Sequence, residues 1–234
     1  MKIAVLNYSG SVGKTVTAHH LLKPRMPNAA FYAVETINQS ASDLGAAEVE
    51  QLRGKDFGAL LESLILEDDA IIDIGASNIE VFMQAMSRYA GSAAEFDLYV
   101  IPVTSEQKAW QESLKTVEAL LSIGVASEKI RLFPNRIQND PTEEIPAIFN
   151  YVKKMKKGWV NPNAFLFESE IYEYLAAKKI GFDTLIDDNA DYRTLAKTET
   201  DPDKRREYAR MYRWTQLAIP VRNNLDEAYA ALVA

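Results

Sequence analysis

The chain has 234 residues, of which 47% are hydrophobic and 25% charged, a balance typical of a globular protein with a core and a solvated surface. It has no cysteine, which excludes disulfides and suits a cytoplasmic protein, and no apolar run of about 18 residues that would cross a membrane. Its net charge of −7, from 26 Lys plus Arg against 33 Asp plus Glu, disfavours strong autonomous binding to a polyanion. We expect a single domain over residues 1–234, in the cytoplasm.

The first predicted element is a strand at residues 2–7, whose centre is the apolar run Ile-Ala-Val-Leu. A glycine-containing loop follows it and ends in Gly13-Lys14-Thr15, ahead of a helix-like run at residues 16–22. Strand, glycine loop, Gly-Lys-Thr and helix are the context of a phosphate-binding loop. The glycines let backbone N–H groups converge on an anion, and the start of the helix adds a favourable dipole.

This loop predicts a site for a nucleoside triphosphate and Mg²⁺. Lys14 is expected to reach the β- and γ-phosphates as the catalytic lysine, and the Thr15 hydroxyl to bind Mg²⁺. The alternative is a glycine-rich turn with an exposed lysine, which the order of strand, loop and helix disfavours. The residues expected to contact the nucleotide here are Ser9, Gly10, Ser11, Val12, Gly13, Lys14, Thr15 and Val16.

The loop departs from the standard GxxxxGK[ST] pattern, which would place a glycine where the chain has Tyr8. Gly10 and Gly13 instead match the deviant form Lys-Gly-Gly-x-Gly-Lys-Thr. Ser9 stands at the place of the first lysine of that form, and Ser11 at the place of its second glycine. The second half of the loop therefore follows the deviant form, and the first half does not.

Further along the chain, apolar strand-like runs alternate with helical stretches, which predicts a parallel sheet covered on both faces. The expected fold is a doubly wound, mostly parallel α/β fold of the P-loop NTPase (SIMIBI-like) class. Besides residues 2–7, the predicted strands are residues 30–35, 70–74, 98–103 and 130–134. The predicted helices include one with Leu60, Leu61, Leu64 and Ile65 on a single face, residues 79–89, and residues 107–123, which Gly124 ends.

The last third of the chain carries weaker patterns. A strand at residues 165–167, a helix at residues 169–179 and a loop at residues 183–191 are expected. Two separate helices are predicted after them, a charged one at residues 201–214 and a terminal one at residues 224–234. We therefore expect one P-loop domain with a C-terminal helical extension at about residues 197–234.

Asp73 ends an apolar run that begins at Ala70, which is the Walker B arrangement of an acidic residue at the carboxyl end of a buried strand. It is expected to hold Mg²⁺ through water beside the phosphate-binding loop. Gly75 follows closely, and a glycine there lets a switch segment, residues 75–78, approach a γ-phosphate. An apolar run that ends in Asp is common, but its place after a phosphate-binding loop favours metal binding.

Two later segments resemble a known family. Residues 96–106, Phe-Asp-Leu-Tyr-Val-Ile-Pro-Val-Thr-Ser-Glu, and residues 130–136, Ile-Arg-Leu-Phe-Pro-Asn-Arg, are similar to segments after Walker B in the ParA/MinD group of deviant-Walker ATPases. The resemblance implies ATP and Mg²⁺ as cofactors and an adenine contact at Asn135, with Arg136 beside it; an ordinary loop asparagine is the alternative. The resemblance to this family extends to about Ala196. Residues 1–10, 20–26 and 34–38 are most similar to StbB-type plasmid stability ATPases.

Two departures from the family pattern bear on mechanism. The resemblance aligns Ser9 with the signature lysine that reaches the partner's phosphates in a nucleotide-sandwich dimer, and a hydroxyl cannot supply that charge. The family also has Asp-x-Asp-Pro-Gln after its second strand, and one of these aspartates positions the attacking water. This chain has Glu35 and Ile37 at the two acidic places. Glu35 or Asp43 is expected to take over that catalytic role, and hydrolysis is expected to be slow, or absent without a partner.

Three other features have ordinary structural interpretations. His19 and His20, on the first helix, are expected to pack or to lie on the surface. Basic groups at residues 153–157 and 204–213 are expected to be solvated helix faces or weak non-specific DNA contacts. The terminal helix, residues 224–234, has an apolar face but no Lys or Arg on its polar face, so we expect it to pack on the domain and not on a membrane.

The favoured hypothesis is a ParA-like nucleotide-switch ATPase for plasmid DNA positioning, segregation or stability. It is expected to form a homodimer, with association that depends on nucleotide, and to act with a DNA-binding adaptor. ATP is favoured over GTP because residues 135–138, Asn-Arg-Ile-Gln, lack the aspartate that guanine recognition usually employs. One alternative is a non-hydrolysing nucleotide-binding scaffold, and another is a metabolic P-loop enzyme of the dethiobiotin-synthetase type.

Overall fold

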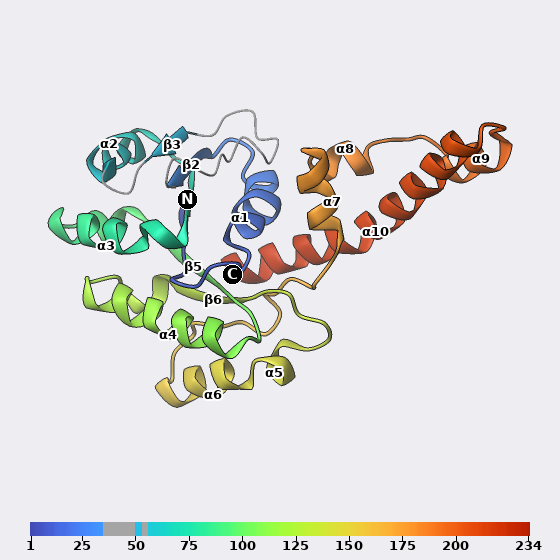
Figure 1. Ribbon diagram of the computed structural model, residues 1–234. Coiled ribbons are helices and arrows are strands. Elements are labelled where there is room, and N and C mark those ends of the chain that lie inside the picture. The colour runs from blue at the N-terminus through green and yellow to red at the C-terminus, as the bar shows by residue number, and fades with distance from the viewer. Residues whose placement is uncertain (35–49, 53–55) are drawn as a thin grey trace.

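The computed structural model describes residues 1–34, 50–52 and 56–234 (Figure 1). These residues form a six-stranded sheet in the order β3-β2-β4-β1-β5-β6, in which each described pair of neighbouring strands is parallel. The strands are β1 (Lys2–Val5), β2 (Ala30–Val34), β3 (Glu50–Leu52), β4 (Ala70–Ile74), β5 (Leu98–Val103) and β6 (Ile130–Pro134).

The strands at the centre of the sheet follow the sequence prediction closely. β4, β5 and β6 have the predicted bounds, and β1 ends slightly earlier than predicted. β2 is described over Ala30–Val34, and the last residue predicted for it, Glu35, lies outside the described residues. The edge strand β3 was not predicted, because its three residues, Glu-Gln-Leu, show neither an apolar run nor alternation. Central strands of a parallel sheet are buried on both faces and are therefore strongly apolar, which is why they can be predicted from their sequences.

Helices cover both faces of the sheet, as a doubly wound fold requires. Alternate residues of β1 enter two separate cores: Ala4 faces one, and Ile3 and Val5 face the other. The core on the Ala4 side is completed by α2 (Phe57–Leu66), α3 (Ile79–Arg88), α4 (Gln107–Ser122) and α6 (Pro146–Met155). The predicted fold class is confirmed.

The core on the Ile3 side begins with the first helical run (residues 14–25), which consists of α1 (Lys14–Val16), a π-helical turn (Thr17–Leu22) and a 3₁₀ turn (Lys23–Arg25). The C-terminal helices complete it: α7 (Ile171–Lys178), α8 (Phe182–Ile186) and α10 (Pro202–Val233). The short helices α5 (Pro141–Glu144) and α9 (Tyr192–Thr198) lie outside these two cores.

Individual helix predictions are mostly confirmed. Gly124, with φ of 89°, lies two residues beyond α4, as expected of a residue that ends a helix. The expectation that Ile65 lies on the buried face of α2 is wrong, because Ile65 is 63% exposed. Leu60 and Leu64 are buried and stand four residues apart, so the next residue along the helix is turned about 100° away from the core.

The C-terminal region differs most from its prediction. One continuous helix, α10, replaces the two predicted helices and runs through Pro220. Ala218 and Val221, on either side of that proline, are buried in the core, and this packing holds the helix together although proline donates no backbone hydrogen bond. Part of the predicted loop at residues 183–191 is instead helical, in α8, because Phe182 and Leu185 are buried.

Figure 1 shows α9 and the first half of α10 extending away from the sheet, while the second half of α10 returns to it. The predicted strand at residues 165–167 is also wrong. These residues make a single isolated bridge, Ile137 to Phe167, and α10 lies beside them at the place where a further strand would pair.

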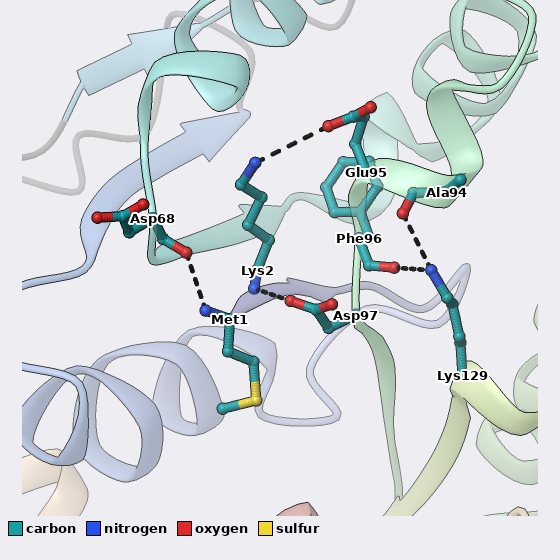
Figure 2. Close-up of polar contacts among 8 residues, drawn as sticks. All are labelled: Met1, Lys2, Asp68, Ala94, Glu95, Phe96, Asp97 and Lys129. Atoms are coloured by element: carbon teal, nitrogen blue, oxygen red, sulfur yellow. Dashed lines mark hydrogen bonds and ion pairs between the residues drawn. The ribbon is translucent and has the colours of Figure 1, made fainter.

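The amino edge of the sheet is closed by polar contacts (Figure 2). The backbone N–H of Lys2 donates to the Asp97 carboxylate at 2.6 Å, and the Lys2 ammonium lies 3.8 Å from Glu95. The Lys129 ammonium donates to the carbonyl oxygen of Phe96 at 2.6 Å. These groups pair with one another at the edge of the sheet opposite the one where the phosphate-binding loop follows β1.

Candidate functional site

The carboxyl edge of the sheet brings the predicted site residues together. The phosphate-binding loop follows β1 there. The strand order is β3-β2-β4-β1-β5-β6, so the chain adds strands first on one side of β1 and then on the other, and ligands usually bind at such a switch point. Asp73 of β4 stands in register with Val5 of β1. Asn135 directly follows β6, and its backbone N–H donates to the carbonyl oxygen of Val103 at 2.8 Å.

The backbone of the loop is strongly curved. Ser11 and Gly13 have φ angles of 58° and 88°, in the left-handed region. A Cβ atom on Gly13 would lie 2.0 Å from Nδ2 of Asn135. The same Nδ2 donates to the carbonyl oxygen of Val12 at 2.8 Å. Gly13 therefore needs to be glycine for two reasons, its backbone conformation and the asparagine packed against it.

The Lys14 side chain lies along the loop that precedes it. Its residue is only 8% exposed, and its ammonium donates to the carbonyl oxygens of Ser9 at 2.8 Å and of Asn7 at 3.2 Å. The helical run begins at this residue. A buried ammonium beside a helix N-terminus is a favourable environment for phosphate oxygens, because both carry positive charge.

Asn7 anchors the loop to the rest of the sheet. Its side-chain nitrogen donates to the carbonyl oxygen of Pro102 and to the Ser113 hydroxyl, both at 2.7 Å, and its side-chain oxygen accepts from the backbone N–H of Ser9 at 2.9 Å. The residue is fully buried. The sequence prediction placed Asn7 at the end of the first strand but gave it no role in the site, although a polar residue at the end of an apolar strand was a usable signal.

Asp73 and Thr15 are placed on the same face of the sheet. Asp73 stands two residues from Ile71 in β4, so the two side chains lie on the same face of the sheet. Ile71 belongs to the core on the Ile3 side, which the first helical run covers, and α1 contacts β4. The Asp73 residue is 3% exposed. Across the described residues no group of three or more His, Cys, Asp and Glu could hold a metal ion. A Mg²⁺ at this place would be held by the Thr15 hydroxyl, the Asp73 carboxylate or its water, and phosphate oxygens, which is the hard oxygen set that Mg²⁺ prefers.

A cavity of about 330 Å³ opens beside the loop. Its size is at the lower end of the range typical of small-molecule sites. One side is formed by the loop, the first helical run and the end of β6, and the other by the wall segment (residues 167–173), which leads into α7. The lining residues are Gly13, Val16, Asn135, Arg136, Phe167, Glu168, Ser169, Glu170, Tyr172 and Glu173.

The sequence prediction included the loop side of this cavity and missed the wall segment. The predicted contact residues that line it are Gly13, Val16, Asn135 and Arg136. The wall segment carries carboxylates, which repel phosphates, so it suits the base and sugar end of a nucleotide better than its phosphate end. The available signal was an extended run at residues 165–167 directly ahead of a helix, the same order of elements as at the loop.

Comparisons with solved structures agree with this geometry. The chain is similar to apo McdA of Cyanothece, with 16% identity, a TM-score of 0.53, and coverage of 96% of this chain and 98% of that chain. It is similar to a chain of the MinC:MinD cell division protein complex of Aquifex aeolicus, with 11% identity, a TM-score of 0.54, and coverage of 96% of this chain and 94% of that chain. The chain has the fold of the ParA/MinD-type ATPases.

A third structure with the ParA/MinD-type fold is a putative plasmid partition protein of Borrelia burgdorferi bound to AMPPNP. It shows 13% identity, a TM-score of 0.50, and coverage of 92% of this chain and 98% of that chain. No protein-family model matches the chain, and no curated protein matches its sequence. The likeness to these structures is therefore one of fold.

The structure describes only one of the two places where the sequence departs from the ParA/MinD pattern. Ser9 is 6% exposed and lies within the loop, where its hydroxyl is 3.4 Å from the carbonyl oxygen of Gly10. The other place lies outside the described residues. It comprises Glu35 and Asp43, which were predicted to position the attacking water, and Ile37, which replaces an aspartate of the family pattern. The catalytic assignment of Glu35 or Asp43 stays a prediction.

Two further predictions concern packing, one for the first helix and one for the terminal helix, and the burial of their residues confirms both. The ring of His20 packs against the rings of Tyr172 and Phe182. Leu225 and Leu232 of the terminal helix are 1% and 2% exposed, in the core of the domain. Within the described ranges, no helix has the length and apolar character needed to cross a membrane.

Acid is expected to destabilise the fold through His20. Burial, reinforced by neighbouring His19, lowers the pKa of His20 from 6.5 to about 3. Because the folded state keeps the ring neutral, the stability that depends on it is complete above pH 6.5. It is lost as the pH falls toward 3, by up to about 1.4 kcal/mol per pH unit. Chemical denaturation across this range measures the slope.

The variant His20→Phe is the control for this acid effect. It keeps an aromatic ring against Tyr172 and Phe182 but carries no titratable group, so its stability should fall less steeply with acid. His19, whose pKa is also lowered by burial, adds a slope of the same sign to both proteins. Equal slopes in the wild type and in His20→Phe would show that His20 does not control the acid response.

Proposed function

We propose that the protein is a Mg²⁺-ATP-dependent switch ATPase of the ParA type that serves plasmid DNA positioning, segregation or stability in the cytoplasm. The observation that carries the proposal is the joining of Gly13, Lys14 and Asn135 at the carboxyl edge, beside a cavity of about 330 Å³. Lys14 supplies charge for the phosphates, and Asn135 connects the loop to the side where a base would lie.

The proposed nucleotide is an adenine nucleotide. Asn135 uses its side-chain nitrogen on the carbonyl oxygen of Val12, so its side-chain oxygen is the atom suited to accept a hydrogen bond from the amino group of adenine. Arg136, held at a φ of 56°, and Phe167 line the cavity and offer flat surfaces to a base. A protein with a similar fold, from Borrelia burgdorferi, was crystallised with the ATP analogue AMPPNP, which supports this choice.

The proposed switch lies beside Asp73. Gly75 follows β4 and donates its backbone N–H to the carbonyl oxygen of Val34 at 3.0 Å, and a 3₁₀ turn (Ala76–Asn78) leads into α3. A γ-phosphate and Mg²⁺ at the loop would bias this segment, because short turns next to a phosphate site change conformation readily with the charge bound there. The proposed output is dimerisation with a second copy of the chain and contact with a DNA-binding adaptor.

The proposed domain organisation is a single P-loop domain in which the C-terminal helical extension, residues 197–234, packs back on the sheet. The basic residues 204–206 and 210 are exposed on the extending part of α10, and those at 153, 154, 156 and 157 are exposed at the end of α6 and just beyond it. With a net charge of −7, they support weak non-specific DNA contact at most, so the adaptor is the proposed route to plasmid DNA.

A non-hydrolysing nucleotide-binding scaffold is the second candidate, and Ser9 favours it. In the family that the sequence resembles, a lysine at this place reaches the partner's phosphates, and the buried hydroxyl of Ser9 carries no charge. Transition-state stabilisation in phosphoryl transfer depends on such cations, so slow turnover or none is expected of the isolated chain.

Sedimentation velocity and phosphate release distinguish the two candidates. The wild-type chain is measured with Mg²⁺-ATP, with Mg²⁺-ADP and without nucleotide, and phosphate release is followed alone and with duplex DNA. A dimer that forms only with Mg²⁺-ATP, together with phosphate release, supports the switch ATPase. ATP binding without phosphate release supports the scaffold, and absence of ATP binding contradicts both.

A further inference from the structure

The C-terminal helix α10 holds the backbone of the segment that forms one side of the cavity. Asn224 of α10 donates its side-chain N–H to the carbonyl oxygen of Phe165 at 3.0 Å, and its side-chain oxygen accepts from the backbone N–H of Phe167, also at 3.0 Å. Both contacts join residues more than fifty positions apart in the chain, and Asn224 is 7% exposed. An amide that bonds to both groups in this way stands in for a neighbouring strand.

Two further contacts from α10 reach the same region. The indole of Trp214 stacks on the ring of Tyr174, with ring centroids 4.2 Å apart. The guanidinium of Arg213 lies 3.9 Å from the carboxylate of Glu170 and 4.2 Å from the centre of the Trp214 ring. Together with Asn224, these contacts reach the wall segment at its start, its middle and just beyond its end.

The inner side of the same backbone is attached to the sheet. Leu166, between the two residues that Asn224 contacts, donates its N–H to the carbonyl oxygen of Pro134 and accepts from the N–H of Ile137, both at 3.0 Å. The backbone groups of an extended segment point alternately to its two sides. β6 and the residues that follow it therefore fix one side of this segment, and Asn224 fixes the other.

We infer that Asn224 is a positioning residue for the nucleotide: by fixing the backbone at Phe165 and Phe167, it sets where the wall segment meets the base and sugar. The inference rests on the proposed function, because it assumes that the cavity of about 330 Å³ receives a nucleotide. Phe167, which Asn224 holds directly, lines that cavity, whereas Asn224 itself does not. Asn224 thus acts on the ligand through the wall and places a residue of the C-terminal helix in control of nucleotide affinity.

The test compares binding of two ligands by the full chain. Mg²⁺-ATP engages both the loop and the wall segment, and inorganic triphosphate engages only the loop. Asn224→Asp keeps the acceptor for the N–H of Phe167 but places a carboxylate against the carbonyl oxygen of Phe165. It is expected to weaken ATP binding roughly ten- to hundredfold and to leave triphosphate binding within about twofold. Asn223→Asp is the matched control, since Asn223 is exposed on the same helix. This variant should bind both ligands as the wild type does.

Acid rescue adds a readout that a general loss of stability does not give. Burial raises the pKa of a carboxyl group, and a protonated Asp at position 224 can again donate to Phe165 while accepting from Phe167. ATP affinity of Asn224→Asp should therefore recover toward that of Asn223→Asp between about pH 8 and about pH 6.

Each outcome decides between the proposals. Selective loss of ATP binding with recovery in acid supports the inference. Equal ATP affinity in Asn224→Asp and wild type, or equal weakening of ATP and triphosphate, overturns the inference and leaves the proposed function standing. Failure of the wild type to bind either ligand overturns the proposed function itself.

Discussion

Replacing Lys14 by Ala is expected to abolish stabilisation of the chain by Mg²⁺-ATP. A ligand present at about 100 times its dissociation constant stabilises the folded state by roughly 2.7 kcal/mol. For a chain of this size that corresponds to a rise in melting temperature of roughly 5–11 °C, which differential scanning fluorimetry detects easily. In Lys14→Ala this rise should fall to nearly zero, because the ammonium is the one group of the loop that carries a full positive charge.

Lys23→Ala is the matched control for this variant. Like Lys14, Lys23 lies on the first helical run and donates to two backbone carbonyl oxygens, those of Pro27 at 3.0 Å and Ala29 at 2.7 Å. Its loss should lower the melting temperature of the free protein but leave the increase with Mg²⁺-ATP unchanged, because its ammonium bonds to the backbone just before the start of β2, at the amino edge of the sheet and away from the loop. If Lys14→Ala keeps the full increase, the loop does not bind triphosphate and the proposed function is wrong.

The loop side of the site can be predicted from the sequence because its residues are close together in the chain. Strand β1, the loop and the first helical run are consecutive, so the spacing of Gly10, Gly13 and Lys14 is enough to predict a phosphate site. Asp73 and Asn135 are also recognisable, because each follows an apolar run that reads as a buried strand. Parallel strands end at the same edge, which brings these residues together without further information.

The wall side of the site depends on contacts between distant parts of the chain. Residues 165–167 read as a strand, yet their outer partner is the side chain of Asn224 on a helix. Nothing in the local pattern around Asn224 distinguishes it from the exposed Asn223 beside it. The same limit applies to α10, whose continuity through Pro220 depends on burial of Ala218 and Val221 in the sheet's core and not on helix propensity.

Gly13→Ala is expected to be more damaging than the same substitution at Gly10 or Gly91. The new Cβ would lie 2.0 Å from Nδ2 of Asn135 and would force an alanine into a φ of 88°. Moving the asparagine would also break its hydrogen bond to Val12, so a loss of roughly 3–4 kcal/mol in the free energy of unfolding is expected. Chemical denaturation without nucleotide measures this loss separately from any effect on ligand binding.

Two other glycines separate the causes of that loss. Gly91 has a φ of 82°, and a Cβ added there would have no heavy atom within 4 Å, so Gly91→Ala should lose only the backbone part, about 1 kcal/mol. Gly10 has neither a left-handed φ nor a close neighbour, and Gly10→Ala should change stability by less than about 0.5 kcal/mol. The ordering Gly13, Gly91, Gly10 therefore tests the geometry of the loop against two internal standards.

A double-mutant cycle with Asn135→Ala then isolates the contact between the loop and the residue after β6. In the Asn135→Ala background the clash is gone and the left-handed φ remains, so the effect of Gly13→Ala should fall to that of Gly91→Ala. The difference between the two backgrounds is the coupling energy between Gly13 and Asn135. A coupling near zero would mean that Asn135 does not pack on the loop, and the link from the phosphate side to the base side would then have to run through other residues.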